Sequence, residues 1–228
     1  MTKSMTRGEA SAAVTDLGWR YVLGAFVTTV PVPSLEVAGA IAARVTASAG
    51  RNGGSHVRVD VRADRVVVTV QTFAVGWTTS EDVEIVHLIT AALNGTTRSV
   101  TAEVGAAPRS VQIIEIAVDA IDIPSVRPFW KAVFGYADEG DRGGSTDPLV
   151  DPWGQGPSIW FQQMDAPRPQ RNRIHFDISV PHDEAADRIK AAVAAGGRIV
   201  GDAEAPAFWV LADPEGNEVC ITTWQGRD

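Results

Sequence analysis

The 228-residue chain is poor in cysteine, in long apolar runs and in positive charge, and each of these shortages argues against a class of protein. It holds a single cysteine, so no disulfide can form within the chain, and such a content is ordinary in a reducing cytosol. No apolar run approaches the roughly 20 residues that a membrane-spanning helix needs. The first residues, MTKSMTRGEASAAV, lack the apolar core of a secretory signal peptide. We therefore expect a cytoplasmic protein without a membrane partner.

Basic residues are fewer than acidic ones. The chain has 20 Lys and Arg against 28 Asp and Glu, a net charge of −8, which argues against a nucleic acid or an anionic membrane surface as partner. Its hydrophobic content of 45% is normal for a globular protein with a core. The length suits one large domain or two ordinary ones.

The most informative stretch is the last third of the chain, which opens on the strand-like segment NRIHFDISV. Apolar and polar residues alternate in it, and successive side chains of a strand point to opposite faces, so one face is apolar and the other carries His175 and Asp177. The helix-like run DEAADRIKAAVAAGG follows, with Ile189 and Val193 one turn apart and expected to cover the apolar face. The polar face must then look at water or into a cavity.

The same pattern occurs about sixty residues earlier. The segment IIEIAVDA aligns with RIHFDISV so that Glu115 corresponds to His175, and a helix-like run, PSVRPFWKAVFG, follows it. The turn DPWGQ at Asp151 then matches DPEGN at Asp213. We interpret residues 111–165 and 172–224 as two copies of a strand–helix–three-strand unit. Because a duplicated unit packs against its copy, equivalent positions of both copies are expected to line one concave surface.

These duplicated βαβββ modules, with FW in the first helix and DPEGNE before the last strand, resemble the vicinal oxygen chelate superfamily, which includes glyoxalase-like domains, bleomycin-resistance proteins and extradiol dioxygenases. The resemblance covers roughly residues 110–228, and we define a glyoxalase-like domain at 109–228. It implies an α+β fold. It does not imply one reaction, because this fold hosts many chemistries.

In catalytic members of that superfamily, the first and last strands of each module supply four ligands to a divalent metal. Carried over to this chain, they are Glu115 and Gln162 from the first module and His175 and Cys220 from the second; a gapless match of the two DP turns gives Ser158 in place of Gln162. A thiolate ligand favours zinc over the magnesium, manganese or iron typical of such sites. His175 would act as metal ligand or general base, paired with Glu115.

A second hypothesis for the same half is a polar cavity that binds a small organic ligand without metal. Asp177 and Trp160 lie on the same predicted strand faces as His175 and Gln162, and they would line such a cavity. The indole of Trp160 would offer a stacking surface for a planar heterocycle.

Residues 1–108 are predicted to form a separate domain, an α/β sandwich. A helix starts at Pro33, a two-stranded hairpin VRVDVRADRVVVTV follows, and Thr78 to Glu81 form a capping box for a helix that runs to Leu93. This order and the phrase VxVxTFxxGWTxxxD, which ends at Asp82, resemble pterin-4a-carbinolamine dehydratase over about residues 12–95.

The resemblance implies an active site for 4a-hydroxytetrahydrobiopterin dehydration with fewer histidines than the family uses. The family's His-His-Pro segment falls on Ser55-His56-Val57, so only His56 is retained, and its third histidine falls on Phe73. Asp82 at the helix start matches. One imidazole can move one proton near neutral pH, whereas Phe73 favours stacking over proton transfer. The family self-associates, so a homo-oligomer is also expected.

Three functions follow from these patterns. The first is a lyase-type enzyme that works in the glyoxalase-like half, with dehydratase activity of the N-terminal half as an alternative site. The second is a sequestering protein of the resistance type that binds a ligand without turnover. The third is a structural or dimerising module. The named cofactor is a divalent metal in the glyoxalase-like half.

Overall fold

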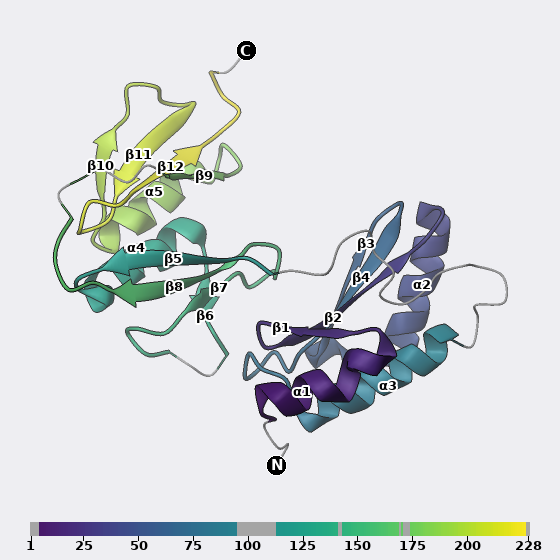
Figure 1. Ribbon diagram of the computed structural model, residues 1–228. Coiled ribbons are helices and arrows are strands. Elements are labelled where there is room, and N and C mark those ends of the chain that lie inside the picture. The colour runs from purple at the N-terminus through teal and green to yellow at the C-terminus, as the bar shows by residue number, and fades with distance from the viewer. Residues whose placement is uncertain (1–4, 95–112, 141–142, 169, 171–173, 227–228) are drawn as a thin grey trace. The chain divides into compact units, whose positions relative to one another are not determined.

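The computed structural model describes residues 5–94, 113–140, 143–168, 170 and 174–226, and it divides the chain into two compact units, Met1–Ile113 and Ile114–Asp228 (Figure 1). The boundary predicted after residue 108 lies outside the described residues, as do the predicted starts of the two modules at 111 and 172. Among the described residues, no helix has both the length and the hydropathy required to cross a membrane.

The N-terminal unit is an antiparallel sheet packed against helices. Its elements are α1 (Arg7–Val14), a 3-10 turn (Thr15–Leu17), β1 (Arg20–Val22), β2 (Ala25–Pro31), α2 (Leu35–Ser48), a 3-10 turn (Gly53–Ser55), β3 (Val57–Val61), β4 (Arg65–Val70) and α3 (Ser80–Asn94). The strand order is β1-β2-β4-β3. One core joins the three helices to the sheet, with Trp19, Phe26 and Ile89 fully buried in it. This half is the predicted α+β layer structure.

The helices of this unit begin where their sequences offer caps. The Ser34 side chain accepts a hydrogen bond from the backbone N–H of Val37 and caps α2, which begins at Leu35, two residues after the predicted start at Pro33. The capping box predicted for α3 is shifted by one residue. The helix starts at Ser80, and the Asp82 carboxylate accepts from the backbone N–H of Thr79 at 2.7 Å. Asp82 rather than Glu81 holds this helix start, because its fully buried carboxylate accepts from both the backbone N–H and the hydroxyl of Thr79.

The C-terminal unit contains two sheets of four strands each. The first module consists of β5 (Glu115–Ala120), α4 (Ile123–Phe134), β6 (Ala137–Asp138), β7 (Leu149–Val150) and β8 (Ser158–Gln163). The second consists of β9 (Phe176–Ser179), α5 (Ala185–Ala194), β10 (Arg198–Gly201), β11 (Phe208–Ala212) and β12 (Glu218–Thr222). The strand orders β5-β8-β7-β6 and β10-β11-β12-β9 are the same order read from opposite edges, with the first and last strands of each module parallel. The predicted pair of βαβββ modules is confirmed.

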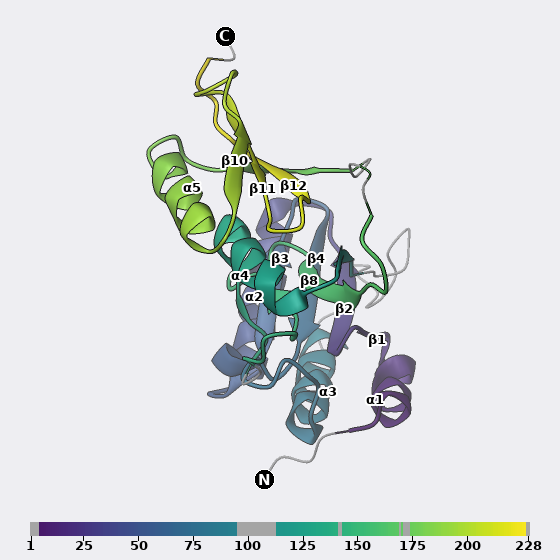
Figure 2. The same ribbon diagram turned by 90° about the vertical axis from the view of Figure 1, so that its left-hand side faces the viewer.

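The two helices of this unit lie between its two sheets, as Figures 1 and 2 show. Helix α4 packs on α5, and a single core contains both helices together with the inner residues of both sheets. Val118 of β5 and Ile178 of β9 point toward the helices in this core. The alternate residues, which include Glu115 and Asp177, therefore lie on sheet faces that are turned away from the helices.

Polar contacts of the DPEGN turn tie the second module to the first. Asp213 is fully buried and its carboxylate accepts a hydrogen bond from the indole N–H of Trp130 in α4 at 2.9 Å. The carboxylate of Glu215 accepts from the backbone N–H groups of Ile121 and Asp122, just before α4. A carboxylate at this end of a helix is favoured by the helix dipole. The second DP turn thus fixes the first helix.

Asp138 holds the end of α4 against the small strand β6. Hydrogen bonds from Lys131 and Arg127 lower the pKa of its carboxyl below the ordinary value. A carboxyl with a lowered pKa stabilises the fold above its unfolded-state pKa, and this contribution is lost as the pH falls through the lowered value. The interaction is therefore fully present at neutral pH.

Candidate functional site

The outward face of the second module's sheet carries a compact group of metal-binding side chains. Strands β9 and β12 run parallel, and Asp177 is paired with Cys220 in their register. Phe176 and Ile178 of β9 are turned into the core, so His175 and Asp177 lie on the opposite face. The alternation of the strand therefore places both residues beside Cys220.

The three side chains lie close enough together to share an ion. One ligand atom from each of His175, Asp177 and Cys220 lies within 4.8 Å of the other two. The His175 Nε2 to Asp177 Oδ1 distance is 3.6 Å, and these side chains are 53% and 60% exposed, whereas Cys220 is 8% exposed. Imidazole nitrogen, thiolate sulfur and carboxylate oxygen are all zinc donors, and catalytic zinc sites typically use three protein ligands. The donor set fits zinc better than magnesium or manganese.

Two hydroxyl groups continue the polar strip on the same face. Ser179 is paired with Thr222 in the register, and their hydroxyl oxygens are 2.8 Å apart. Val210 of β11 is paired with Cys220 and adds an apolar neighbour. The face thus combines a metal-binding cluster, hydroxyl groups and an apolar edge, which are the components of a site for a small polar molecule.

The residues predicted in the first module occupy the outward face of the other sheet. Glu115 is paired with Ser158, and the Ser158 hydroxyl donates to the Glu115 carboxylate at 3.4 Å. Gln162 is paired with Asp119, further along the strands. Of the two alternatives for the last-strand position, Ser158 is therefore the one beside Glu115. Trp160 lies between Ser158 and Gln162 on this face of β8 and is 36% exposed.

The two modules of one chain do not bring their outward faces together. Helices α4 and α5 lie between the two sheets (Figure 2). Because the core faces of both sheets are turned to these helices, Glu115 and Gln162 face away from His175 and Cys220. The single hollow expected from the duplication is not formed within one chain, because the modules pack through their helices. A single chain brings His175 and Cys220 together with Asp177. The sequence predicts Asp177 as a cavity-lining residue and not as a metal ligand. The signal for it was the His-x-Asp alternation on one strand.

A second polar cluster lies in the N-terminal unit around Asp82. This carboxylate is fully buried, and His56 is 5% exposed with its Nδ1 atom 2.8 Å from Asp82 Oδ1. The other oxygen, Oδ2, accepts from the hydroxyl groups of Thr72 at 2.7 Å and Thr79 at 3.1 Å. The structure brings His56 and Asp82 together as a buried pair. The threonines that complete it were not predicted as partners, although both lie within the VxVxTFxxGWTxxxD phrase.

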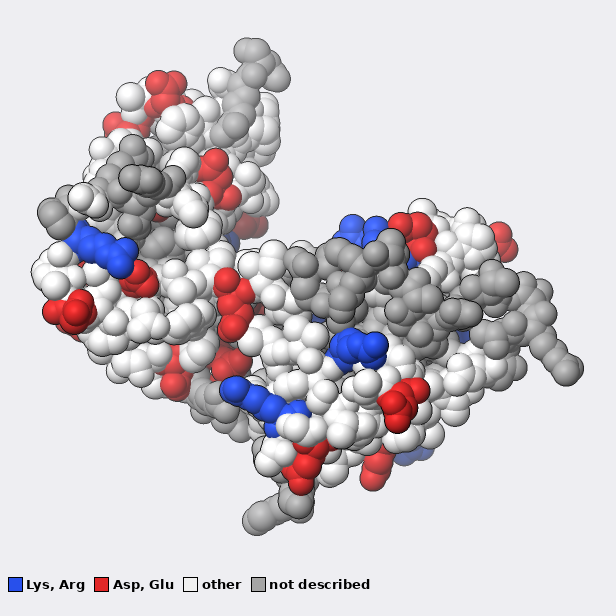
Figure 3. Space-filling view, in the orientation of Figure 1, with Lys and Arg blue, Asp and Glu red and all other residues white. Residues whose placement is uncertain are grey.

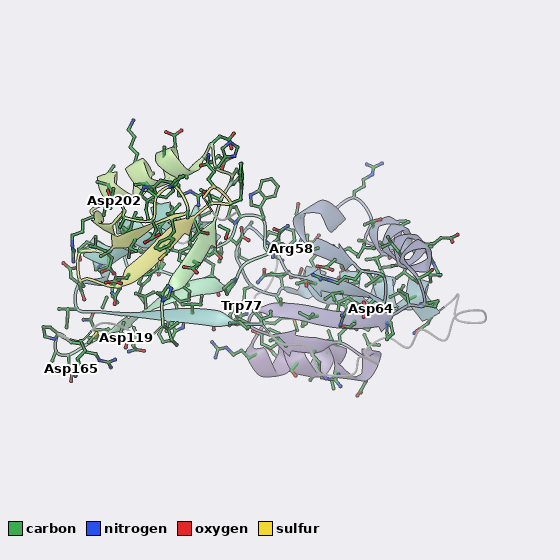
Figure 4. All side chains as sticks on the ribbon, turned by 90° about the horizontal axis from the view of Figure 1, so that it is seen from above. Arg58, Asp64, Trp77, Asp119, Asp165 and Asp202 are labelled. Atoms are coloured by element: carbon green, nitrogen blue, oxygen red, sulfur yellow. The ribbon has the colours of Figure 1, made fainter. Side chains whose placement is uncertain are left out.

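The far side of the His56 ring reaches toward the surface. Its Nε2 atom lies 3.8 Å from the carboxylate of Glu81, which also accepts from the Asn52 side chain at 2.6 Å. The guanidinium of Arg58, which lies on β3 and is labelled in Figure 4, is placed over the ring of Phe73, with its carbon 4.3 Å from the ring centroid. Phe73 is thus occupied by a cation–π contact within the chain. A planar ligand would compete with Arg58 for that ring.

The basic side chains visible in Figure 3 are dispersed. On the face shown in Figure 3, the described basic side chains stand singly among uncharged and acidic ones and form no continuous basic area.

The second half of the chain is similar to a known family. Residues 115–222 match the family model described as a glyoxalase-like domain. A search of curated proteins gave no match.

Several solved structures align with part of the chain. A glyoxalase/bleomycin resistance protein/dioxygenase family enzyme from Burkholderia phytofirmans PsJN is 20% identical, with a TM-score of 0.39 over 48% of this chain and 95% of that chain. A glyoxalase-related enzyme from Fulvimarina pelagi is 20% identical, with a TM-score of 0.39 over 49% and 87%. A mutant fosfomycin resistance protein from Listeria monocytogenes, complexed with Mn(II) and 1S,2S-dihydroxypropylphosphonic acid, is 13% identical, with a TM-score of 0.37 over 50% and 92%. These likenesses concern the fold alone.

Proposed function

We propose that the glyoxalase-like half binds a zinc-class divalent metal through His175, Asp177 and Cys220 and uses it to hold a small oxygen-bearing molecule. The observation that carries this proposal is the convergence of three donor atoms within 4.8 Å of one another on an outward sheet face. Two of the three side chains are more than half exposed, so a ligand from solvent can reach them.

Different side chains of this sheet face would contact different parts of the bound molecule. With three protein ligands, a bound zinc keeps a position for an oxygen of the small molecule and polarises it. The Ser179 and Thr222 hydroxyl groups lie two residues along the same strands and can donate to or accept from further polar atoms of that molecule. Val210 would contact its apolar part.

The two functions proposed for this site differ in what happens after binding. A lyase-type enzyme would convert a bound substrate such as a hemithioacetal, and a sequestering protein would hold its ligand unchanged. Turnover of hemithioacetals with zinc present would support the enzyme. Saturable quenching of tryptophan fluorescence without turnover would support sequestration.

We expect the metal-free protein to take up one zinc ion per chain. Removal of one ligand should weaken binding at least about 100-fold, as much as or more than the loss of an outer-shell partner of a metal site. His175→Ala and Cys220→Ser are the variants to compare, by competition with a chromophoric chelator and by elemental analysis.

His182→Ala is the matched control, since His182 belongs to the same module but contacts Trp224. Zinc uptake by wild type no greater than the buffer background would refute the site. So would an equal loss of zinc affinity in the His182 and His175 variants.

Self-association could cover the exposed metal-binding cluster with a sheet face of a second copy of the chain. Because Trp160 and the metal-binding cluster lie on opposite faces of one chain, only a second copy can bring a Trp160 face onto the cluster. We therefore propose a homo-oligomer. Light scattering should give a mass that is a multiple of 24.2 kDa, and a monomer at micromolar concentration would contradict it.

A second candidate function, dehydration of a 4a-hydroxytetrahydropterin, is favoured by the buried His56–Asp82 pair. Asp82 orients the ring of His56, whose other nitrogen is directed to the surface, an arrangement suited to proton transfer. In addition, Thr72 and Thr79 satisfy the second carboxylate oxygen. This cluster supports a pterin-dehydratase-like N-terminal domain.

We expect His56→Ala to lower the dehydration rate about 100-fold, the smaller end of what general acid–base catalysis contributes. The measurement is loss of the 4a-hydroxypterin absorbance, corrected for the spontaneous reaction. His87→Ala, at an exposed histidine of α3, is the control and should keep the wild-type rate. A wild-type rate equal to that of buffer would exclude this function.

A further inference from the structure

Cys220 is the only cysteine of the chain and belongs to a metal-binding group. Its neighbours in the strand, Val219 and Ile221, are turned into the core, so its thiol lies on the outward face. It is 8% exposed, but His175 and Asp177 beside it are more than half exposed. A small solute can therefore approach the sulfur between them, whereas a bulky reagent meets the surrounding sheet.

We propose that Cys220 is a reversible oxidation site that controls whether the cluster holds its metal. The proposal rests on the metal site proposed above, and it assigns a regulation to that site. A thiolate that binds metal is also the form of cysteine that reacts with oxidants. A single modification would therefore change both properties.

The oxidant is a hydroperoxide, and the step is a two-electron oxidation of sulfur. The sulfur lone pair attacks one peroxide oxygen, the O–O bond breaks, an S–O bond forms and the second oxygen leaves as hydroxide. The sulfenic acid of Cys220 is the first product on the cysteine oxidation ladder. A sulfenic acid no longer supplies the thiolate, so the cluster keeps only the His175 and Asp177 donors. Two exposed donors bind zinc more weakly than three, and the ion is released.

The cysteine content of the chain decides how the oxidised form is reversed. Since no second cysteine exists, the sulfenic acid cannot close an intrachain disulfide. An external low-molecular-weight thiol would condense with it to a mixed disulfide and water, and a second thiol would exchange to return the Cys220 thiol. The switch thus responds to peroxide and to the thiol pool of its compartment.

Zinc-loaded protein treated with one equivalent of hydrogen peroxide tests the proposal. A chromophoric chelator reports released zinc. Intact mass reports the added oxygen atom, and dimedone captures the sulfenic acid. We expect zinc release and Cys220 oxidation to proceed in equal amounts, and zinc to rebind after dithiothreitol. The same zinc-loaded protein given peroxide together with catalase is the control, and it should retain both its zinc and an unmodified Cys220.

The outcomes separate the two proposals. Zinc that loads but stays bound while Cys220 is oxidised overturns the regulation and leaves the metal site intact. Zinc release by peroxide without an added oxygen atom on Cys220 also overturns it, because the sulfur would then be irrelevant. Failure of wild type to load zinc at all removes the metal site, and the regulation with it.

Discussion

Gly197→Ala should destabilise the C-terminal unit by about 3 kcal/mol, the upper end of the ordinary cost of overpacking. A Cβ atom added at Gly197 would lie 2.2 Å from a ring carbon of Phe129 and 3.0 Å from the carbonyl oxygen of Ala192. Phe129 is fully buried and packs edge-on against Trp130, so its ring has no free space into which it can move. Urea denaturation followed by tryptophan fluorescence would measure the loss.

Gly201→Ala is the control for this experiment, because the nearest atom to its added Cβ, on Val210, is 3.5 Å away. That contact is ordinary, so the variant should retain nearly the wild-type free energy of unfolding. Phe129→Leu in the Gly197→Ala background should recover part of the loss by opening space for the methyl group. Equal stability of the two alanine variants would contradict the steric explanation.

Asp213→Ala should cost at least about 3 kcal/mol, since each buried donor left without an acceptor costs about 1–3 kcal/mol. The carboxylate accepts from the indole N–H of Trp130 and from the backbone N–H groups of Glu215 and Asn217, all at 2.9 Å, and it is fully buried. Its removal would leave these three donors without their acceptor. Thermal unfolding and urea denaturation would both register the change.

The duplicate turn supplies the matched variant for Asp213. Asp151 accepts from the backbone N–H groups of Trp153, Gln155 and Gly156, but these contacts are exposed, so water can replace the carboxylate. Asp151→Ala should therefore cost about 1 kcal/mol, the net value of a typical hydrogen bond. If both variants lost the same stability, burial would not be the reason that Asp213 matters.

Much of the architecture was accessible from the sequence because each module carries its own local signals. The alternation around His175, the helix ending near Gly196 and the repeated DP turns were enough to predict two βαβββ modules. The prediction for α5 was less accurate. Ile189 is buried as expected, but Ala192 is the buried neighbour and Val193 is 42% exposed. In a helix packed closely against α4, small side chains fit better than branched ones.

The site was harder to predict because it depends on how the modules pack. Local alternation fixes which residues share a strand face, and it placed His175 and Asp177 together correctly. Whether Glu115 joins them depends on whether the two sheets or the two helices meet, and no local pattern encodes that choice. The His56–Asp82 pair depends likewise on a contact between a loop and a helix start. Only the resemblance to a dehydratase pointed to that contact.

The position of α4 and α5 between the sheets also limits how the C-terminal unit could be divided. Both modules contribute buried side chains to one shared core, from Trp130 in the first module to Leu211 in the second. Neither module has a complete hydrophobic core of its own, although each has its own four-stranded sheet. Fragments separated in the connection between them would have to find each other before either could fold, as the halves of a split reporter do.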